Sequence, residues 1–383
     1  MFTLVHPIPS LHPHLVTGAT GFVGSAIVLE LLLRTDATVV GVVRGRPDEA
    51  PTRRLRAVLH GLIEAYALPQ RLHAAIDARV HAVEGDLQSP ACGVAEDPRL
   101  SGAEVWHSAA SLQYQDRHQE QIYATNVDGT RNVVALARRI GARRLNHVST
   151  AYVAGTKTGL IQPEPGELSH TNNHYERSKI LAEALATESG LPTRILRPGI
   201  VIGHGATRHA LNYNGLYGFI RGLWKFRNAL DRAQAGLGAR TLVHLRADAE
   251  GDLGLVSVDA VAAEAVGLSL VDAAPGIYHL TNPTPPTTGL TMRCAFESVG
   301  LPAPALVRDF ETHTALDRKL QQGVDFYNAY LVAPKRFDRS ATDAALGDAV
   351  APGLALGEDA LRAFCDWYVE ILDAAPETLR VAS

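Results

Sequence analysis

Short apolar segments alternate with amphipathic ones along the first half of the chain. Apolar runs, which are typical of buried strands, cover residues 15–16, 37–43, 80–84, 104–107, 144–148 and 193–197. Helical periodicity between them predicts helices over about residues 25–34, 51–67, 71–78, 126–140 and 175–190. Strands that alternate with helices favour a parallel sheet with helices on both faces. The pattern therefore predicts an α/β fold with a doubly wound parallel sheet.

The alternation ends after Gly203, and the chain beyond it is less regular. Strands are expected to return at 253–258 and 276–280, whereas Pro-rich turns and scattered helices follow Pro283. This change predicts a smaller, discontinuous C-terminal lobe that binds the substrate. The expected division is a nucleotide-binding domain over 1–203, with returning strands at about 251–282, and a substrate lobe over 204–250 and 283–383.

Composition restricts the class of protein further. The chain of 383 residues is 46% hydrophobic and 20% charged, and 36 Lys and Arg against 40 Asp and Glu give a net charge of -4. Binding along a phosphate backbone favours a basic protein, so no nucleic-acid partner is expected. No apolar run approaches the roughly 18 residues of a membrane span, and the first residues lack the pattern of a signal peptide.

The side chains that bind metals or form disulfides are scattered. The three cysteines, Cys92, Cys294 and Cys365, are odd in number and far apart, which is typical of a reducing compartment. The 16 histidines show no metal-ligand spacing. We therefore expect a cytoplasmic protein without a metal site or a membrane span.

A glycine turn joins the first predicted strand to the first predicted helix. Gly18, Gly21 and Gly24 form a Gly-x-x-Gly-x-x-Gly pattern. In Rossmann-type folds the first glycine permits a tight turn, the second lets the backbone approach a pyrophosphate, and the third lets helix and strand pack closely. The helix N-terminus then points at the anion. The pattern predicts dinucleotide binding, and the absence of a following Gly-Lys-Ser/Thr argues against a phosphate loop of the nucleotide-triphosphatase type.

The residue after the second predicted strand distinguishes NAD from NADP. An acidic residue there binds the 2′-hydroxyl of NAD, whereas an arginine accommodates the 2′-phosphate of NADP. Val43 is followed by Arg44, with Arg46, Arg53 and Arg54 nearby and no Asp or Glu at the strand end. NADP is therefore the expected cofactor, and NAD is the less favoured alternative.

A Tyr-x-x-x-Lys pattern, Tyr175 and Lys179, lies at the start of a predicted helix. The spacing places both side chains on one helix face, where the ammonium lowers the pKa of the tyrosine and can also hold ribose hydroxyls of a nicotinamide cofactor. Ser149 and Thr150 follow the strand over 144–148, at the carboxyl edge of the sheet where ligands bind. A hydroxyl, a tyrosine and a lysine in this order predict an oxidoreductase site.

These motifs together resemble those of the extended short-chain dehydrogenases/reductases. Residues 17–24, TGATGFVG, are similar to the nucleotide signature of that family, and residues 148–155, VSTAYVAG, to its strand with the catalytic hydroxyl. The resemblance implies Thr150, rather than Ser149, as that hydroxyl, with Tyr175 and Lys179 as catalytic partners. One departure is His107-Ser108-Ala109-Ala110, which replaces the more usual Asn-Ala/Gly-Ala turn.

Further segments resemble the cofactor site of the family. Residues 85–87 are similar to a turn that contacts adenine, and residues 196–203 to the segment beside the nicotinamide amide. The resemblance and the strand-end arginines together imply these cofactor contacts: Thr17, Gly18, Thr20, Gly21, Phe22, Val23, Gly24, Arg44, Arg54, Asp86, Leu87, Ser108, Ala109, Ala110, Asn126, Tyr175, Lys179, Pro198, Gly199 and Ile200.

Within this superfamily the chain most resembles the male-sterility or thioester-reductase type, which includes fatty acyl-CoA reductases and terminal reductase domains of carrier-protein assembly lines. The similar segments are 42–44, 126–130, 255–262 and 277–282. The resemblance covers roughly residues 15–282 and extends poorly to the C-terminal hundred. It implies an acyl thioester as substrate, carried by CoA or by an acyl or peptidyl carrier protein that arrives in trans.

Three functions fit these motifs to different degrees. The leading hypothesis is NADPH-dependent reduction of an acyl thioester to an aldehyde, with further reduction to the alcohol left open. The same triad also fits a dehydrogenase or ketoreductase of a secondary alcohol or ketone, as in hydroxysteroid-type relatives. The third is a catalytically silent NADP-binding protein, against which the complete set of Thr150, Tyr175 and Lys179 argues. The oligomeric state is also open, and an oligomer is among the options.

Two aromatic segments of the lobe are candidates for the substrate wall. Aromatic side chains are more often core than ligand contacts, which favours a core role for residues 326–331 and Phe337. The segment 212–220, followed by Trp224, comes after the strand expected beside the nicotinamide. We therefore expect residues 212–220 to line the acyl pocket.

Overall fold

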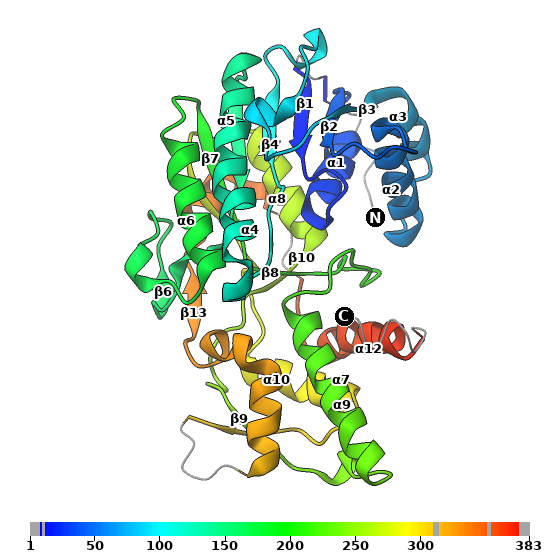
Figure 1. Ribbon diagram of the computed structural model, residues 1–383, viewed down its shortest axis with the longest axis vertical. Helices are drawn as coiled ribbons and strands as arrows, with labels where there is room; N and C mark the ends of the chain where they lie inside the picture. Colours follow the sequence, from blue (N-terminus) through cyan, green and yellow to red (C-terminus); the bar gives the residue numbers. More distant parts are fainter. Residues whose placement is uncertain (1–7, 10–11, 309–313, 351–353, 375–383) are drawn as a thin grey trace.

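Seven parallel strands form the central sheet. They are β1 (His14–Thr17), β2 (Val39–Val43), β3 (Val80–Glu84), β4 (Glu104–His107), β5 (Arg144–Val148), β7 (Thr193–Pro198) and β11 (Gly276–Leu280). Their order across the sheet is β11-β7-β5-β4-β1-β2-β3, so the winding reverses between β1 and β4. The computed structural model describes residues 8–9, 12–308, 314–350 and 354–374, and the sheet lies in the upper body of Figure 1.

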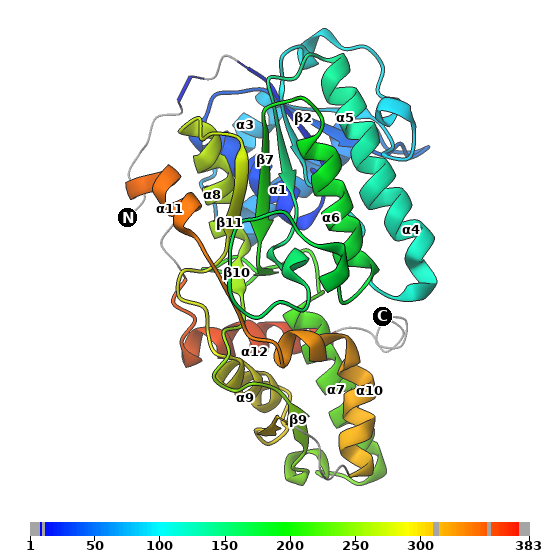
Figure 2. The ribbon, with the colours of Figure 1, turned by 90° about the vertical axis from the view of Figure 1, so that its left-hand side faces the viewer.

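Helices cover both faces of this sheet, as Figures 1 and 2 show. Alternate residues of a strand face the two layers, because side chains alternate along a strand. In β1, Val16 belongs to the core beneath α1 (Phe22–Arg34) and α8 (Val258–Leu270), and Leu15 belongs to the core beneath α5 (Gly129–Arg139). The expected Rossmann-type α/β fold is therefore confirmed. One layer contains α1 (Phe22–Arg34), α2 (Pro51–Ala65), α3 (Arg71–Arg79) and α8 (Val258–Leu270), and the other contains α4 (Gln119–Tyr123), α5 (Gly129–Arg139) and α6 (His174–Thr187).

A second body, the lobe, lies below the sheet in Figure 1 and has a core of its own. Apolar faces of its helices meet there, and the buried side chains include Phe219, Leu223, Phe296 and Phe364. Among the described residues the lobe contains the α-helices α7 (Leu216–Ala233), α9 (Thr288–Ser298), α10 (Ala315–Leu331) and α12 (Glu358–Ala374), together with a strand pair of β9 (His244–Arg246) and β12 (Ala305–Val307).

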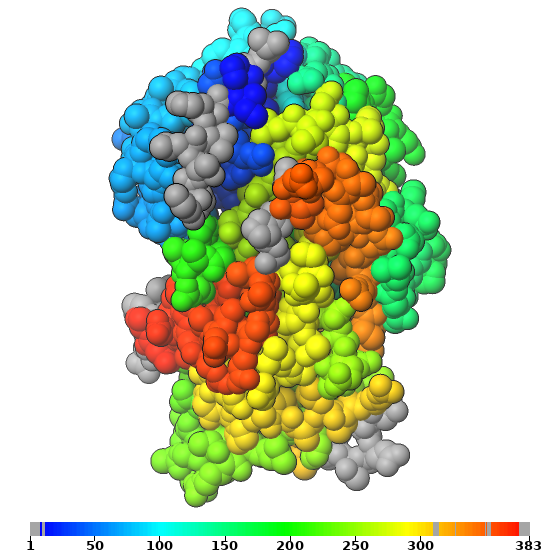
Figure 3. All heavy atoms as spheres, turned by 180° about the vertical axis from the view of Figure 1, so that it is seen from behind, coloured from blue at the N-terminus to red at the C-terminus, as the bar shows by residue number. Residues whose placement is uncertain are grey.

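The chain passes between the two bodies several times. The strand expected over 253–258 is the short β10 (Leu255–Ser257), which pairs with β8 (Ile200–Ile202) instead of joining the main sheet. A further pair joins β6 (Gly159–Ile161) to β13 (Lys335–Phe337). After β13 the chain returns to the sheet, where α11 (Ser340–Leu346) packs on α8 and β11 and appears in orange in Figure 3. The region expected as lobe from residue 283 onwards therefore includes one segment that packs on the sheet.

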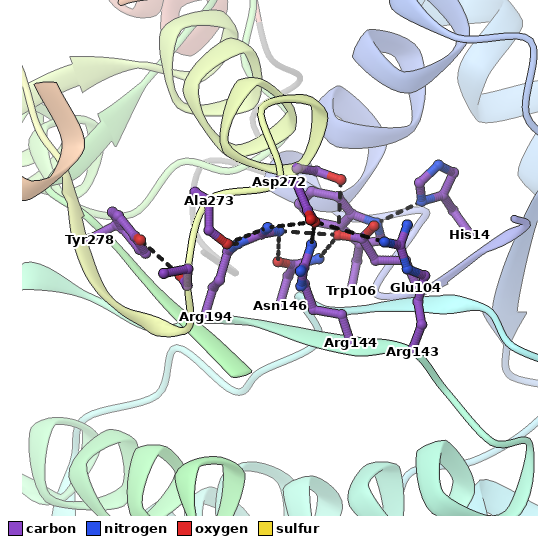
Figure 4. Close-up of polar contacts among 12 residues, drawn as sticks. His14, Glu104, Trp106, Arg143, Arg144, Asn146, Arg194, Asp272, Ala273 and Tyr278 are labelled. Carbon is purple, nitrogen blue, oxygen red and sulfur yellow. Dashed lines mark hydrogen bonds and ion pairs between the residues drawn. The ribbon is translucent and has the colours of Figure 1, made fainter. Parts of the chain in front are cut away.

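A buried polar cluster lies at the amino ends of β4, β5 and β7 (Figure 4). Arg194 Nη1 lies 3.3 Å from Glu104 Oε1, to which Asn146 Nδ2 donates at 2.7 Å. Arg194 also donates to the carbonyl of Ala273 at 2.8 and 2.6 Å, and Arg144 pairs with Asp272 at 2.6 Å. These contacts tie the segment between α8 and β11 to the sheet, at the edge opposite the carboxyl ends of the strands.

Candidate active site

A cleft of about 1140 Å³ lies where the carboxyl ends of the sheet strands meet the lobe. The segments after β1, β2, β4, β5 and β7 form one part of its wall, and residues of α7 and α10 form another. Open sheets of this kind bind ligands at the switch point in strand order, which here lies between β1 and β4. The cleft is therefore the natural place for a cofactor and a substrate to meet.

The glycine turn between β1 and α1 lies in this wall. Gly18 has a φ of 70°, in the left-handed region that favours glycine, and a Cβ there would lie 2.7 Å from the Ala109 nitrogen. A Cβ on Gly24 would lie only 2.2 Å from the carbonyl oxygen of Gly18. Gly21 precedes α1 with an extended backbone and lines the cleft. The turn thus brings bare backbone and the start of a helix to the cleft, which suits a pyrophosphate.

Most residues implied as cofactor contacts line the cleft. Thr17 does not, because its Oγ1 is buried behind the wall, 2.8 Å from His107 Nδ1 and 3.3 Å from the Ala109 nitrogen that it accepts from. Thr17 therefore supports the turn over 108–110 from behind. Those that line the cleft are Gly18, Thr20, Gly21, Phe22, Val23, Gly24, Arg44, Arg54, Asp86, Leu87, Ser108, Ala109, Ala110, Tyr175, Lys179, Pro198, Gly199 and Ile200.

Asn126 is, after Thr17, the second implied cofactor contact that does not line the cleft. It lies in a π-helical turn, Ala124–Asp128, where the sequence pattern predicts regular helix. Its side chain accepts from the Ser111 nitrogen at 2.7 Å and donates to Ser178 Oγ at 2.9 Å. Asn126 thus connects the loop after β4 to α6, and it positions the wall without lining it.

An arginine corner lies at the end of β2. Arg54 Nη2 donates to the carbonyl of Arg44 at 2.7 Å, whereas Arg54 Nη1 is buried without a protein partner. Arg44 and Arg46 are exposed and line the same part of the cleft. A buried guanidinium nitrogen that lacks an acceptor is stabilised by an anion that supplies one. The corner is therefore suited to a phosphate group.

The three residues of the predicted triad come together where β5 ends. Thr150 and Tyr175 share a hydrogen bond, and Thr150 Oγ1 also accepts from the Tyr152 nitrogen at 3.2 Å. Lys179 is buried, and its Nζ donates to the carbonyl of Val148 at 2.8 Å. Ser149 Oγ is buried without a protein partner, although Ser149 also lines the cleft. The hydroxyl paired with the tyrosine is thus that of Thr150.

The electrostatics of the triad differ from the sequence-based expectation. Burial and the charge of Glu176 raise the pKa of Tyr175, although the hydrogen bond with Thr150 opposes that rise. Lys179 is not among the groups that shift this pKa, and its ammonium donates to the carbonyl of Val148. Burial also lowers the pKa of Lys179 itself to about 8, while Glu183 opposes that shift.

The part of the cleft beyond the triad differs in charge from the part that would hold the cofactor. Every charged residue among the described lining belongs to the arginine corner, to Asp86 or to Lys179. The lining beyond the triad is polar but uncharged, or apolar: Leu112, Gln113, Tyr114, Gln121, Thr125, Tyr152, Asn212, Asn214, Gly215, Leu216, Phe219, Leu253, Leu255, Met292, Tyr327, Tyr330 and Leu331.

Sequence reasoning placed one wall of this pocket and missed another. Residues of the segment 212–220 line it, whereas the core role favoured for 326–331 is incomplete because Tyr327, Tyr330 and Leu331 also line it. The aromatic spacing of that segment was visible, but nothing in it distinguished a core face from a cleft face. Within the described residues, no helix is long and apolar enough to span a membrane, and no three His, Cys, Asp or Glu are grouped to hold a metal ion.

Known proteins resemble this chain in sequence. The family model described as Male sterility protein matches residues 16–265. Isonitrile lipopeptide synthase of Streptomyces coeruleorubidus is 34% identical over 219 residues, which are 54% of this chain and 14% of that protein. Fatty acyl-CoA reductase 8 of Arabidopsis thaliana is 32% identical over 165 residues, which are 39% of this chain and 33% of that protein. The matched region is thus about a third or less of each relative's length.

Solved structures resemble the chain over nearly its whole length. The terminal R domain from the myxalamid PKS-NRPS biosynthetic pathway is 27% identical with a TM-score of 0.74, and 97% of this chain covers 95% of that one. The UDP-glucuronic acid 4-epimerase of Bacillus cereus in complex with NAD shares the fold, at 16% identity and a TM-score of 0.62, with 95% and 99% covered. Because the family model spans well over half of the chain, this protein belongs to the male sterility family, the thioester-reductase type of extended short-chain dehydrogenase/reductase.

Proposed function

We propose that the chain is an NADPH-dependent reductase that converts an acyl thioester into an aldehyde. The observation that carries this proposal is the hydrogen-bonded pair of Thr150 and Tyr175 beside Lys179 in the cleft wall. The glycine turn lies in the same cleft, and an uncharged pocket extends beyond the triad. A carbonyl group bound in this cleft has two hydroxyl donors for its oxygen.

The proposed cofactor is NADP, for which the arginine corner is the support. The unpartnered Nη1 of Arg54 and the exposed Arg44 suit the charged 2′-phosphate better than the uncharged 2′-hydroxyl of NAD. The bare backbone of the glycine turn would hold the pyrophosphate, and Lys179 would hold ribose hydroxyls.

The residues of the triad have distinct roles in this reduction. When bound, NADPH supplies a hydride to the thioester carbon. Tyr175 and Thr150 donate hydrogen bonds to the carbonyl oxygen, on which negative charge develops. The raised pKa of Tyr175 keeps its proton in place until that oxygen accepts it. The resulting hemithioacetal then collapses, which releases the thiol and leaves the aldehyde.

The pocket beyond the triad supports a neutral, largely apolar acyl group. A charged substrate group there would lose its hydration and find no counter-charge among the described lining. Leu112 of the lining, which is 42% exposed, offers apolar surface instead. A nucleoside diphosphate sugar would bring two negative charges, and no cation among the described residues that line this part of the cleft would meet them. The thioester is proposed to arrive on CoA or on a carrier protein.

Single-turnover oxidation of NADPH, with the product identified, tests this function. On a panel of acyl-CoAs, carrier-bound acyl groups and ketones, we expect aldehyde from the thioesters and no reduction of the ketones. Tyr175→Phe removes one hydroxyl, so the rate should fall by roughly 10²–10⁴ while NADPH still binds. Reduction of ketones alone would assign the site to a ketoreductase. NADPH binding without any reduction would indicate a silent binding protein.

A further inference from the structure

The catalytic tyrosine is followed directly by a buried carboxylate. Glu176 has no exposed surface, and its oxygens accept from the Asn172 nitrogen at 2.6 Å, from Asn172 Nδ2 at 3.2 Å and from the Tyr330 hydroxyl at 2.7 Å. Burial raises the pKa of Glu176, and these hydrogen bonds oppose the rise. A buried carboxylate is strongly destabilising when its partners are removed. The donors to Glu176 are therefore energetically important.

Tyr330 reaches this carboxylate from the lobe. It lies near the end of α10, and its hydroxyl also accepts from Asn173 Nδ2 at 3.0 Å. Asn173 is the N-cap of α6, where its Oδ1 accepts from the Glu176 nitrogen at 3.0 Å. One hydroxyl of the lobe is thus bonded to both the cap and the first turn of the helix that carries Tyr175.

The ring of Tyr330 contacts the segment that carries the other catalytic hydroxyl. It packs edge-on against Tyr152, with the ring centroids 5.1 Å apart and the planes at 79°. The Tyr152 nitrogen in turn donates to Thr150 Oγ1. A single side chain of α10 therefore touches the two segments that hold Thr150 and Tyr175, and it also lines the cleft.

We propose that Tyr330 and Glu176 form a latch that holds the lobe closed over the cleft and positions Tyr175 as proton donor. The proposal rests on the proposed function, and both members are positioning residues. When the lobe moves away, Glu176 keeps its place on α6 but loses a donor, so the closed arrangement is favoured. In that arrangement the carboxylate lies beside Tyr175 and opposes loss of its proton.

The groups that face Glu176 influence the ionisation of both latch residues. Lys335, buried in β13, favours the ionised form of Glu176. Burial and the charge of Glu176 raise the pKa of Tyr330 well above its ordinary value, so Tyr330 remains the donor. Glu176 likewise raises the pKa of Tyr152 and of Tyr175, which adds to the effect of burial.

Tyr330→Phe tests the latch, and Tyr123→Phe is its matched control. The Tyr123 hydroxyl also bonds at the start of α6, 3.3 Å from His174 Nδ1, but it comes from α4 rather than from the lobe. We expect Tyr330→Phe to lower kcat on an acyl thioester about tenfold with NADPH affinity within twofold, and Tyr123→Phe to leave kcat within twofold. Equal effects of the two variants would overturn the latch.

Glu176→Gln adds a readout that a merely structural role would not move. It removes the charge beside Tyr175, so the alkaline limb of the kcat/KM profile should shift to lower pH. Because the two residues act through one contact, the Tyr330→Phe/Glu176→Gln double variant should be no slower than the slower single variant. An unmoved pH profile, or additive losses in the double variant, would contradict the proposal.

Amide hydrogen exchange on the full chain tests the latch independently of catalytic activity. In Tyr330→Phe, amides of α10 and of the first turn of α6 should exchange faster together, whereas Tyr123→Phe should leave α10 unchanged. If wild type reduces no thioester, the proposed function fails, and the exchange data still decide whether the lobe is latched. Unchanged exchange in both elements of Tyr330→Phe would refute the latch.

Discussion

Lys179 is an ammonium held where burial opposes its charge. Its folded-state pKa of about 8 lies below the ordinary 10.5, so the folded protein binds fewer protons than the unfolded chain between these values. Stability therefore rises as the pH increases from about 8 to 10.5, and the full penalty applies below 8. A shift of this size corresponds to roughly 3 kcal/mol. Lys179 therefore lowers the stability of the fold, and its proposed role is to hold the ribose of the cofactor.

Lys179→Met should stabilise the cofactor-free protein while abolishing its activity. Methionine keeps most of the length of the side chain and removes the buried charge, and the lost hydrogen bond to Val148 offsets only about 1 kcal/mol. We expect the unfolding midpoint at pH 7 to rise by a few degrees, and the gain to shrink as the pH approaches 10. Thermal unfolding of both proteins across this pH range measures the effect. A lower midpoint for the variant at pH 7 would contradict this explanation.

Arg54→Ala should weaken NADP binding selectively. The loss of a charge-assisted bond to the 2′-phosphate costs about 1.5–3 kcal/mol, so we expect a roughly ten- to hundredfold weaker Kd for NADP and little change for NAD. Arg44→Ala should act in the same direction. Arg53→Ala is the control, because Arg53 bonds to the carbonyl of Asp48 and does not line the cleft. Titration with both cofactors decides the matter, and equal losses for NAD and NADP would disprove the assignment.

Contiguous motifs made many site residues predictable from sequence. Gly18, Thr150 and Lys179 belong to short patterns whose spacing follows from the geometry of one turn, strand or helix. Tyr330 could not be found in this way, because its hydroxyl meets Glu176 across 154 residues of chain. Such a contact depends on how two bodies pack, and neither residue stands out locally.

At the scale of elements, the strands of the sheet were the most predictable part. Strands buried on both faces tend to be apolar throughout, as in β2 (Val39–Val43), which lies within the predicted run 37–43. The run over 253–258 is equally apolar, yet it forms the three-residue β10 outside the main sheet. Periodicity identifies a buried strand but does not determine which strand it pairs with.

The junction of β1 and α1 leaves no room for a side chain at Gly24. Gly24→Ala places a Cβ 2.2 Å from the backbone oxygen of Gly18, which cannot move aside cheaply, so α1 must shift on the sheet. The Cβ of Gly21→Ala meets the same oxygen at 3.2 Å, and the backbone at Gly21 is extended. We expect Gly24→Ala to lower the unfolding midpoint strongly, and Gly21→Ala to leave it nearly unchanged while weakening NADPH. Parallel melting and binding curves test this pair, and equal midpoints would count against the packing role of Gly24.

At the scale of the whole molecule, four strands of the sheet carry a buried histidine. They are His14 on β1, His107 on β4, His147 on β5 and His279 on β11. Burial lowers the pKa of His14 and His279 to about 4 and that of His107 to about 3, and it lowers that of His147 well below 6.5. Each stays neutral in the fold at neutral pH but binds a proton in the unfolded chain below pH 6.5.

These histidines should make the fold sensitive to acid. Above pH 6.5 the histidines do not reduce the free energy of unfolding. As the pH falls from 6.5 towards 4, they lower it by about 1.4 kcal/mol per histidine and pH unit. His147→Met should flatten this dependence, because both ring nitrogens of His147 lack a protein partner and methionine does not titrate. Unfolding midpoints of wild type and variant between pH 4.5 and 7 test this, and identical slopes for the two proteins would refute it.

The division of the lobe into separate chain segments has a consequence for synthesis on the ribosome. Helix α7 ends at Ala233, but α12, which packs against it, begins only at Glu358. At typical rates of translation this interval lasts on the order of ten seconds. During that time the nascent chain carries an apolar helix, with Phe219 and Leu223 on the face that the finished lobe buries. Folding of the lobe during synthesis therefore requires that the apolar face of α7 stay covered until α12 emerges from the ribosome.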